Sequence, residues 1–376
     1  MFDWAKQKLG VSDPTYRSSA ILSVAEQASE TPFSELKREN QAWECIEATS
    51  VESKTFYMVS NSGKFAWVQV IYSNIMNLRR TVHFNTKIYP QDPSGDLIWS
   101  LVNVLNFSFS PDKQDFAADD CSLSLDESGE SFQINSRVDP GIIVDLTFTK
   151  TAPGIVAGKN GTTNFGPDPE TPWGRIKHAF WPRCRVEGTI MTRQGLMDFD
   201  GQGMVSHALQ GMQPHLAAAR WNFGFFQGPT YSAFMMEFIT PPSYGNTIVN
   251  VGAIATDGTI VLAGASPLTR VQHVETRVDP ETDYPEPCVV DLTWEGTGTG
   301  GRNMKAKITS SLGARTDRID VMGEMPRVVK QLLATASGAK PYIYQYIRKV
   351  KLMITFDDQV FREEEGQLFM ETTFLS

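Results

Sequence analysis

The sequence predicts a mainly β protein with two antiparallel domains, and three observations support this prediction. Runs rich in β-branched and aromatic residues recur along most of the chain. Short turn sequences such as Asn61-Ser62-Gly63 and Asp257-Gly258 separate these runs, as in antiparallel hairpins. The length of 376 residues exceeds the size at which one core usually stops growing. We therefore expect two barrels or sandwiches, each with its own core.

The expected strands follow the alternating runs in chain order. They cover residues 55–59, 64–72, 81–89, 97–109, 131–138, 142–150, 185–192, 231–240, 247–255, 259–263, 289–294, 305–309 and 367–374. Helices are expected to be few. One is predicted over residues 325–336, with Pro326 near its start and Gly338 after its end, and a shorter one over residues 214–221.

An internal repeat supports duplication of one domain type. Arg137-Val138-Asp139-Pro140, followed by residues 144–148, is echoed by Arg277-Val278-Asp279-Pro280, followed by residues 290–294. Aspartate and glycine cluster over residues 198–203, where we expect the domain boundary. The predicted organisation is an N-terminal segment 1–18, a first domain 40–199 and a second domain 200–376.

Charge and composition exclude several classes of function. A net charge of -9 and a pI near 5.2 argue against nucleic acid as a partner, because phosphate binding requires a basic surface. The cysteines at 45, 121, 184 and 288 lie far apart, which favours free thiols over a disulfide framework or a zinc site. No apolar run reaches the roughly 20 residues that span a bilayer, and no secretory signal is recognised.

The first eleven residues, MFDWAKQKLGV, show the pattern of an interfacial helix. At a helical step near 100° per residue, the apolar side chains share one half of the circle, and Lys8 lies within that arc. Phe2 and Trp4 suit insertion at the level of the lipid head groups, and the segment is too short to be a stable helix alone in water. The alternative is a terminus that docks on its own domain. The predicted membrane-binding residues are Met1, Phe2, Trp4, Ala5, Lys6, Lys8, Leu9 and Val11.

Residues 210–245 combine a large aromatic and methionine content with glycines and prolines. Such a stretch can form the wall of a site for an apolar ligand, or the ordinary core of a curved sheet. Strict alternation from Tyr231 places Tyr231, Ala233, Met235 and Glu237 on one face of a strand. For Glu237 we favour an outer, solvent-facing position, because burial of an unpaired charge is costly.

A second aromatic stretch covers residues 173–183. Alternation places His178 and Phe180 on one side, with Trp173 near them, and Trp181 on the other side. A histidine among aromatic residues is typically a hydrogen-bonded core residue; as a binding residue it would donate to a ligand hydroxyl or amide. The candidate lipid-binding residues are Trp67, Trp173, His178, Phe180, Trp181, Trp221, Phe223, Phe225, Phe226, Tyr231 and Met235.

These two stretches, together with residues 67–75 and 340–346, resemble the fungal survival-factor family of double lipocalin-like proteins over almost the whole chain. The resemblance implies two lipocalin-like domains that bind ceramide or a related sphingolipid and move it between endoplasmic reticulum and Golgi. It also implies a role in survival of oxidative stress, without a cofactor. The implied location is the cytoplasm and the surfaces of endoplasmic reticulum and cis-Golgi membranes, with a nuclear location left open.

Two other classes of function remain open at this point. Double lipocalin-like folds also include pericyclases and a hydratase, for which His178, Trp181 and Tyr231 would be the candidate residues. The barrels of a stress-response scaffold would instead be filled by side chains. His207 and His215 are eight residues apart without a third ligand at a metal spacing, so no metal is assigned, and no hydrolase motif is found. The residues also leave open which barrel, or which cleft between barrels, would hold a lipid.

Overall fold

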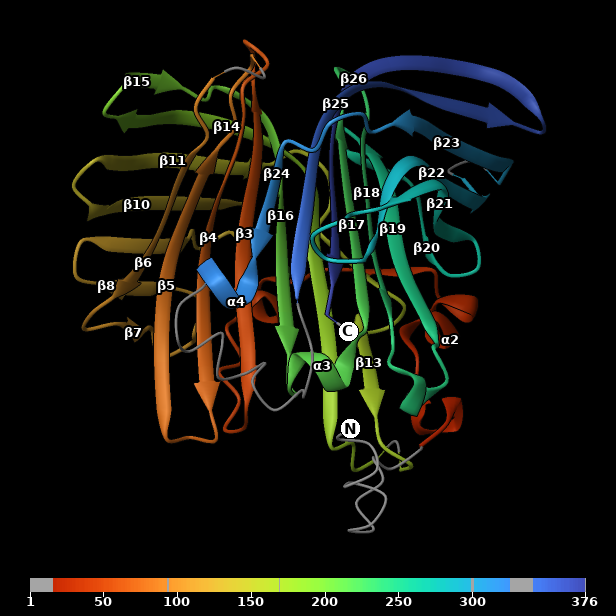
Figure 1. Cartoon of the computed structure of the whole chain (residues 1–376), viewed down its shortest axis with the longest axis horizontal. Helices are drawn as coiled ribbons and strands as arrows, with labels where there is room; N and C mark the ends of the chain where they lie inside the picture. Colours follow the sequence, from red (N-terminus) through yellow and green to blue (C-terminus); the bar gives the residue numbers. More distant parts are fainter. Residues whose placement is uncertain (1–15, 93–94, 169, 299–300, 325–340, 376) are drawn as a thin grey trace.

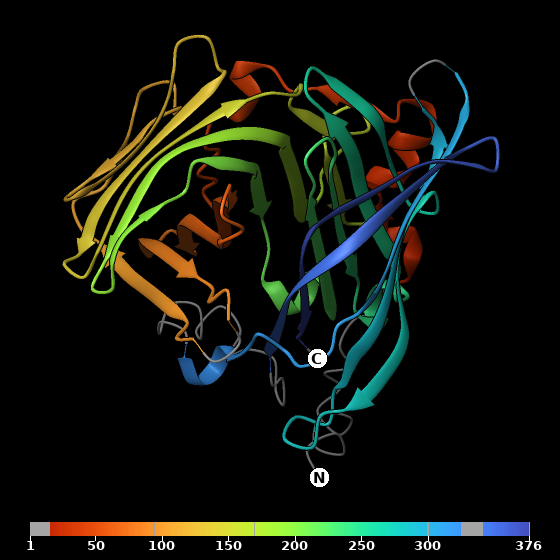
Figure 2. The same ribbon diagram turned by 90° about the horizontal axis from the view of Figure 1, so that it is seen from above.

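Two curved antiparallel sheets lie side by side in the computed structural model, which describes residues 16–92, 95–168, 170–298, 301–324 and 341–375 (Figure 1). The first sheet occupies the left of Figure 1 and the second the right. Seen from above, each sheet curls around its own interior (Figure 2). We call the two units the first and the second barrel. The predicted mainly β, antiparallel fold is confirmed.

The first barrel contains the described strands up to residue 210. They are β1 (Ile21–Leu22), β2 (Phe33–Glu35), β3 (Ser50–Ser60), β4 (Phe65–Ile75), β5 (Arg79–Ile88), β6 (Ile98–Val104), β7 (Ser108–Phe109), β8 (Phe116–Ala118), β9 (Cys121–Leu125), β10 (Ser131–Asp139), β11 (Ile142–Lys150), β12 (Ile155–Ala157), β13 (Thr162–Phe165), β14 (Gly174–Thr192), β15 (Gly195–Asp198) and β16 (Gly201–Gln210). The main path runs β6-β5-β4-β3-β16-β14-β11-β10-β9-β8-β7. A side-chain hydrogen bond connects β6 to β10, from Ser100 Oγ to Asp139 Oδ2 at 2.6 Å.

The second barrel contains the described strands from residue 220 onward. They are β17 (Arg220–Gln227), β18 (Ser232–Ile239), β19 (Ile248–Thr256), β20 (Thr259–Ala265), β21 (Thr269–Val278), β22 (Pro285–Thr297), β23 (Asn303–Ser311), β24 (Asp317–Asp320), β25 (Tyr342–Phe356) and β26 (Gln359–Phe374). The path is β20-β19-β18-β17-β26-β25-β23-β22-β21, with β24 paired to β25. The β25–β26 hairpin is much longer than the predicted strand at 367–374.

Helices are short within the described residues. They are η1 (Ser18–Ala20), α2 (Val24–Glu30), η2 (Arg38–Gln41), α3 (Pro214–Ala217), η3 (Pro242–Tyr244) and α4 (Val321–Glu324). The predicted helix at 214–221 is wrong in extent: it is the single turn α3, because Arg220 and Trp221 already pair with β18 and β26. The predicted helix at 325–336 and the predicted membrane-binding residues 1–11 lie outside the described residues. None of the described helices is long and apolar enough to cross a membrane.

The internal repeat corresponds to two similar hairpins. Asp139 ends β10, which pairs with β11, and Asp279 follows β21, which pairs with β22. The predicted boundary between residues 199 and 200 precedes β16, which still pairs with β3 and β14 of the first barrel. The chain changes from one sheet to the other between residues 210 and 220.

Buried apolar side chains form three clusters, and their positions explain how two barrels make one molecule. One cluster, which includes Phe56 and Trp181, fills the first barrel. Another, which includes Trp294 and Tyr346, fills the second barrel. The remaining cluster contains residues of both barrels, including Phe180 and Phe234, so the outer face of one barrel packs against the outer face of the other. All four cysteines are free.

A buried arginine adds a polar connection between the barrels. Arg183 of β14 is 1% exposed, and its guanidinium donates four hydrogen bonds to the second barrel, one of them from Nη1 to the Gly228 carbonyl at 3.4 Å. Nε bonds Asp257 Oδ1 at 2.8 Å, Nη1 bonds Ser232 Oγ at 3.0 Å and Nη2 bonds the Pro229 carbonyl at 2.8 Å. The planar guanidinium can satisfy several acceptors at fixed angles, which fixes the barrels relative to each other.

The predicted outer position of Glu237 is wrong. Glu237 is 2% exposed and lies inside the second barrel, on the face of β18 that also carries Met235. Its carboxylate accepts hydrogen bonds from Asn222 Nδ2 and Asn250 Nδ2, both at 2.9 Å, and from the Val271 backbone N–H at 3.1 Å. These donors come from three different strands. Their hydrogen bonds compensate for the loss of water around the carboxylate, which was the cost that led us to expect an exposed position.

Candidate functional site

Most of the candidate binding residues lie on the surface between the two barrels, which we call the junction. The first barrel contributes the outer faces of β3, β4, β5, β14 and β16, and the second contributes β17, β18, β19, β25 and β26. Strands that face each other across the junction occur in the same spatial order in the two sheets. Lys87 of β5 meets Gln345 of β25, Tyr57 of β3 meets Phe223 of β17, and Phe180 of β14 meets Phe234 of β18.

Aromatic rings from both barrels form the middle of the junction. Phe180 and Phe234 have ring centroids 4.1 Å apart, Tyr57 and Phe223 are 4.9 Å apart, and Phe65 and Phe369 are 5.0 Å apart. These distances lie in or just below the range of favourable aromatic pairs. Strand alternation explains the arrangement. Every second side chain of a strand lies on the outer face of its sheet, and in these strands the outer face points toward the other barrel.

Packing across the junction is incomplete. Tyr57, Trp221, Met236, Ile343 and Glu371 point into it, yet all five are only half-buried. These side chains lie on the strands that form the junction, and part of each stays open to solvent. An apolar ligand would gain contact area at such positions.

His178 is a neutral polar group within this apolar surface. Its ring lies 5.9 Å from Phe180 and 6.1 Å from Trp221, and the residue is 7% exposed. Burial, with a further contribution from His207, lowers the pKa of His178 to about 4. Among the described residues, none forms a hydrogen bond with the imidazole nitrogens. A neutral imidazole carries one donor and one acceptor, so both are free for a ligand hydroxyl or amide.

A chain of buried hydrogen bonds crosses the junction beside the aromatic rings. Trp67 Nε1 donates to the Tyr89 hydroxyl at 3.2 Å, and that hydroxyl donates to Gln345 Oε1 at 2.7 Å. Lys87 Nζ also donates to Gln345 Oε1, at 2.8 Å, and forms an ion pair with Asp317. Gln345 Nε2 then donates to Glu371 Oε2 at 2.6 Å. We call this series the relay.

Burial affects the ionisable members of the relay. It raises the pKa of the Glu371 carboxyl above its ordinary value, although Gln345 and Lys87 oppose the shift. It lowers the pKa of Lys87 despite the attraction of Asp317. Burial also raises the pKa values of Tyr57 and Tyr89, and the nearby Glu371 carboxylate adds to both shifts.

The structure distributes the eleven candidate lipid-binding residues over four places. The junction contains Trp67, His178, Phe180, Trp221, Phe223 and Phe225. The second barrel contains Phe226 and Met235 in its core, with Tyr231 packed against them, and the first barrel contains Trp181. Trp173 is 47% exposed and donates from Nε1 to the Tyr244 hydroxyl at 2.8 Å. Lipid contact by any of these residues stays a prediction.

The first barrel offers little space around Trp181. The cavity bounded by Lys54, Phe132, Trp181 and His207 has a volume of about 10 Å³, which is room for about one water molecule. Trp181 itself packs against Phe132 in a tilted arrangement with ring centroids 4.6 Å apart. An acyl chain does not fit at this point of the first barrel.

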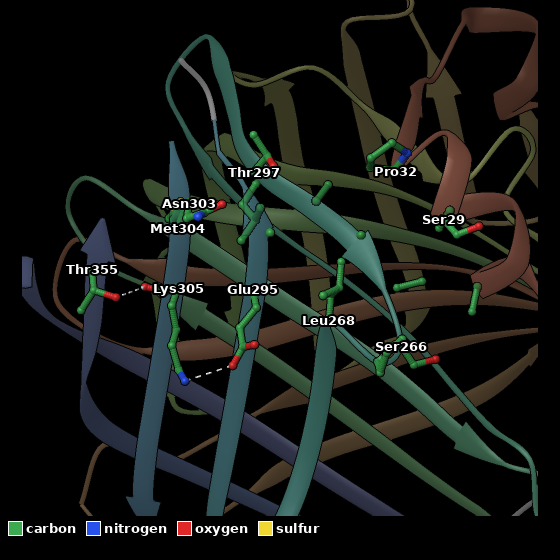
Figure 3. Close-up of a pocket in the computed structure, with 18 of the residues that line it drawn as sticks. Ser29, Pro32, Ser266, Leu268, Glu295, Thr297, Asn303, Met304, Lys305 and Thr355 are labelled. Carbon is green, nitrogen blue, oxygen red and sulfur yellow. Dashed lines mark hydrogen bonds and ion pairs between the residues drawn. The ribbon is translucent and has the colours of Figure 1, made fainter. Parts of the chain in front are cut away.

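Larger depressions lie at the surface of the described residues, and two of them are lined mostly by residues of the second barrel. One, of about 650 Å³, adjoins the junction where Val59 and Gln227 meet the β25–β26 hairpin at Lys349 and Gln367. The other, of about 740 Å³, lies between α2 and strands β20, β22 and β23 of the second barrel (Figure 3). Its rim carries the Lys305–Glu295 ion pair at 3.0 Å.

The three residues considered for catalysis do not converge. His178 lies in the junction, Trp181 points into the first barrel, and Tyr231 packs against the core of the second barrel. Within the described ranges, there is no group of three His, Cys, Asp or Glu side chains that could hold a metal ion.

Sequence reasoning did not find Lys87, Gln345 and Glu371. Each occupies a polar position in an alternating strand, which is the usual pattern for a solvent-facing side chain. The sequence around them gives no sign that these polar side chains meet a second sheet. Which faces meet is decided by contacts between residues more than 250 positions apart, such as Lys87 and Gln345.

Comparisons with known proteins cover the whole chain. The model of the Svf1 family matches residues 2–376. A protein named ceramide-binding protein svf-1 from Neurospora crassa is 46% identical, over 100% of both chains. One named ceramide-binding protein svf1 from Schizosaccharomyces pombe is 38% identical, over 98% of this chain and 97% of that protein.

Solved structures show the same architecture at low identity. CghA has a TM-score of 0.62 at 11% identity and covers 95% of this chain and 98% of its own. Kievitone hydratase from Nectria haematococca has a TM-score of 0.52 at 12% identity, with 96% and 98% covered. At such identities the similarity shows the fold alone, and it confirms the predicted lipocalin-like architecture. Because the family model and the relatives match over nearly the full length, the chain belongs to the Svf1 family, which confirms the resemblance found in its sequence.

Proposed function

We propose that this protein binds ceramide or a related sphingolipid, with the lipid chains in the junction between its barrels. The observation that carries the proposal is the junction itself, where aromatic rings of both barrels meet and several side chains remain half-buried. The names of the relatives as ceramide-binding proteins support the choice of ligand.

The physical argument concerns the cost of moving a two-chain lipid through water. Each methylene group removed from water contributes about 0.8 kcal/mol, so a long acyl chain leaves a membrane only if another apolar surface receives it. The junction provides such a surface, and its half-buried side chains provide places for a chain. The interior of the first barrel near Trp181 is too small for this purpose.

A carrier also has to reach and leave membranes. We propose that residues 1–11 bind weakly and reversibly to the surfaces of endoplasmic reticulum and Golgi through the apolar arc described above. Transfer of ceramide between these membranes would be the resulting activity, and survival under oxidative stress its cellular consequence. Tyr16, the first described residue, packs its ring against that of Trp173, with ring centroids 4.7 Å apart.

The test is the identity of lipids that co-purify with the intact protein, measured by native mass spectrometry. The wild type is expected to retain ceramide. Ala208 lies directly opposite His178 on the junction face of β16 and is half-buried, so Ala208→Trp is expected to fill the site and remove the lipid. The matched control is Ala117→Trp, at an exposed position of β8. A wild type without bound lipid, or equal retention by both variants, would overturn the proposal.

A further inference from the structure

Glu371 places a carboxylate beside the aromatic rings of the junction. It lies on β26, directly opposite Phe223 of β17 on one side and Gln345 of β25 on the other. The Tyr57 ring, which stacks on Phe223, is close enough for the carboxylate to raise the pKa of its hydroxyl. The side chain is half-buried, so part of it stays accessible within a mainly apolar surface.

The relay fixes the orientation of the Gln345 amide. Its oxygen, Oε1, accepts hydrogen bonds from both Lys87 Nζ and the Tyr89 hydroxyl. An ammonium group can only donate, so this end of the amide has to be the oxygen and the other end the nitrogen. Nε2 therefore donates to Glu371 Oε2, and this contact at 2.6 Å holds the carboxylate in place.

The other carboxylate oxygen has no such partner. Among the described residues, none donates a hydrogen bond to Oε1 of Glu371, whereas the remaining members of the relay bond one another. A carboxylate oxygen can accept more than one hydrogen bond, and desolvation makes an unused acceptor costly. Burial raises the pKa of this carboxyl because desolvation disfavours its charged form, and Gln345 and Lys87 offset this effect only in part.

We propose that Glu371 determines specificity for the polar head of the lipid, with Oε1 accepting a hydrogen bond from the amide N–H. This assignment rests on the proposed lipid site in the junction. Gln345 and the relay behind it act as positioning residues, because they aim the carboxylate without contacting the lipid. The selected class is lipids whose head carries an amide N–H close to two long chains.

The chemistry of two-chain lipids gives this acceptor a discriminating role. A ceramide head offers one amide N–H and two hydroxyl groups. A diacylglycerol of similar shape offers one hydroxyl and esters in place of the amide, and an N-methylated ceramide lacks the N–H. A site built around a buried acceptor rejects ligands that leave the acceptor unpaired more strongly than an apolar pocket rejects a change in size.

Glu371→Gln is the informative variant because the relay predicts its orientation. Gln345 Nε2 needs an acceptor, so the new side chain would turn its oxygen to Gln345 and its NH2 group to the lipid. The substitution therefore replaces the free acceptor by a donor while keeping the shape. The matched control is Glu365→Gln, on the same strand at an exposed position.

The experiment compares fluorescence titrations of the full chain with a ceramide and a diacylglycerol that carry the same short fluorescent acyl chain. We expect the wild type and Glu365→Gln to prefer the ceramide, and Glu371→Gln to lose about tenfold or more of that preference. Unchanged diacylglycerol binding by Glu371→Gln would show that the junction remains intact. Equal preference in all three proteins would overturn the assignment.

A second measurement does not depend on folding of a variant. The wild type is titrated with the same ceramide and with its N-methylated form, and we expect about tenfold or more weaker binding of the latter. Equal binding of the two lipids by the wild type would overturn the assignment of Glu371 and leave the proposed lipid site standing. If the wild type binds neither probe, the proposed function itself fails.

Discussion

The rings of Phe180 of the first barrel and Phe234 of the second pack against each other in a tilted arrangement with centroids 4.1 Å apart, and both side chains are 1% exposed. Each residue lies on the outer face of its own sheet, where an isolated barrel would present it to water. The pair therefore belongs to a core that exists only when both barrels are folded and docked. Stability of either barrel is expected to depend on the other.

Phe234→Ala tests this dependence. Removing a buried ring loses its transfer free energy and leaves a cavity against Phe180, so we expect a loss of about 3 to 5 kcal/mol in the free energy of unfolding. Urea denaturation followed by tryptophan fluorescence measures the loss. Phe361→Ala, at a position 60% exposed, is the control and should change stability by less than about 0.5 kcal/mol. A small effect of Phe234→Ala would mean that the barrels are stable independently.

Alternation along β18 was predictable from the sequence, but the environment of each face was not. Tyr231, Met235 and Glu237 do share one face, as predicted. Glu237 was expected outside because burial of an unpaired charge is costly, and a strand of an antiparallel sheet usually has one solvent-facing side that could hold it. Here the other face meets the first barrel, so both faces are buried. Only a long-range contact such as Phe180 with Phe234 could have revealed this.

Replacing Glu237 tests whether its burial depends on its donors. Glu237→Leu would leave Asn222 Nδ2, Asn250 Nδ2 and the Val271 N–H without their acceptor inside the second barrel. Each unsatisfied buried group costs about 1 to 3 kcal/mol, so we expect a clear loss of stability in urea denaturation. The matched control, Glu365→Leu at an exposed position of β26, should be nearly neutral. A Glu237→Leu protein as stable as the wild type would contradict the role of this network.

The candidate site was predictable in part for a similar reason. Phe180, Phe223 and Phe225 came from two separate aromatic stretches as candidate lipid-binding residues, and the structure brings them together in the junction. Phe226 and Met235 were grouped with them by proximity in sequence, but strand alternation turns both into the second barrel. The relay was not predicted, because its members Lys87 and Gln345 come from different barrels. A single sequence does not show which polar residues of two distant strands will meet.

Acid is expected to destabilise the protein through His178. Burial lowers the pKa of this side chain from 6.5 to about 4, so between these pH values the unfolded chain binds a proton that the folded chain does not. Stability is thus unaffected by this group above pH 6.5, falls as the pH drops toward about 4, and then levels off. The full effect is on the order of 3 kcal/mol.

His178→Gln isolates this contribution, because glutamine stays neutral at every pH. The free energy of unfolding measured by urea denaturation at about pH 8 and about pH 5 should differ less in the variant than in the wild type. His273, whose pKa burial also lowers to about 4, remains in both proteins and supplies a common background. Identical pH dependence of the two proteins would show that His178 is protonated or exposed in the folded state.

Membrane attachment is expected to depend on the apolar arc of residues 1–11 and not on the barrels. Deletion of this segment should abolish flotation with vesicles of anionic and zwitterionic phospholipids, while circular dichroism of the β-sheet stays unchanged.

A second experiment compares two double variants that add the same charge to different sides of the predicted helix. Phe2→Glu with Trp4→Glu places two carboxylates in the apolar arc, whereas Gln7→Glu with Gly10→Glu places them on the opposite side. We expect the first pair to prevent flotation and the second to weaken it slightly, since charge repulsion alone acts on both. Flotation of the deletion variant at the wild-type level would refute the anchor.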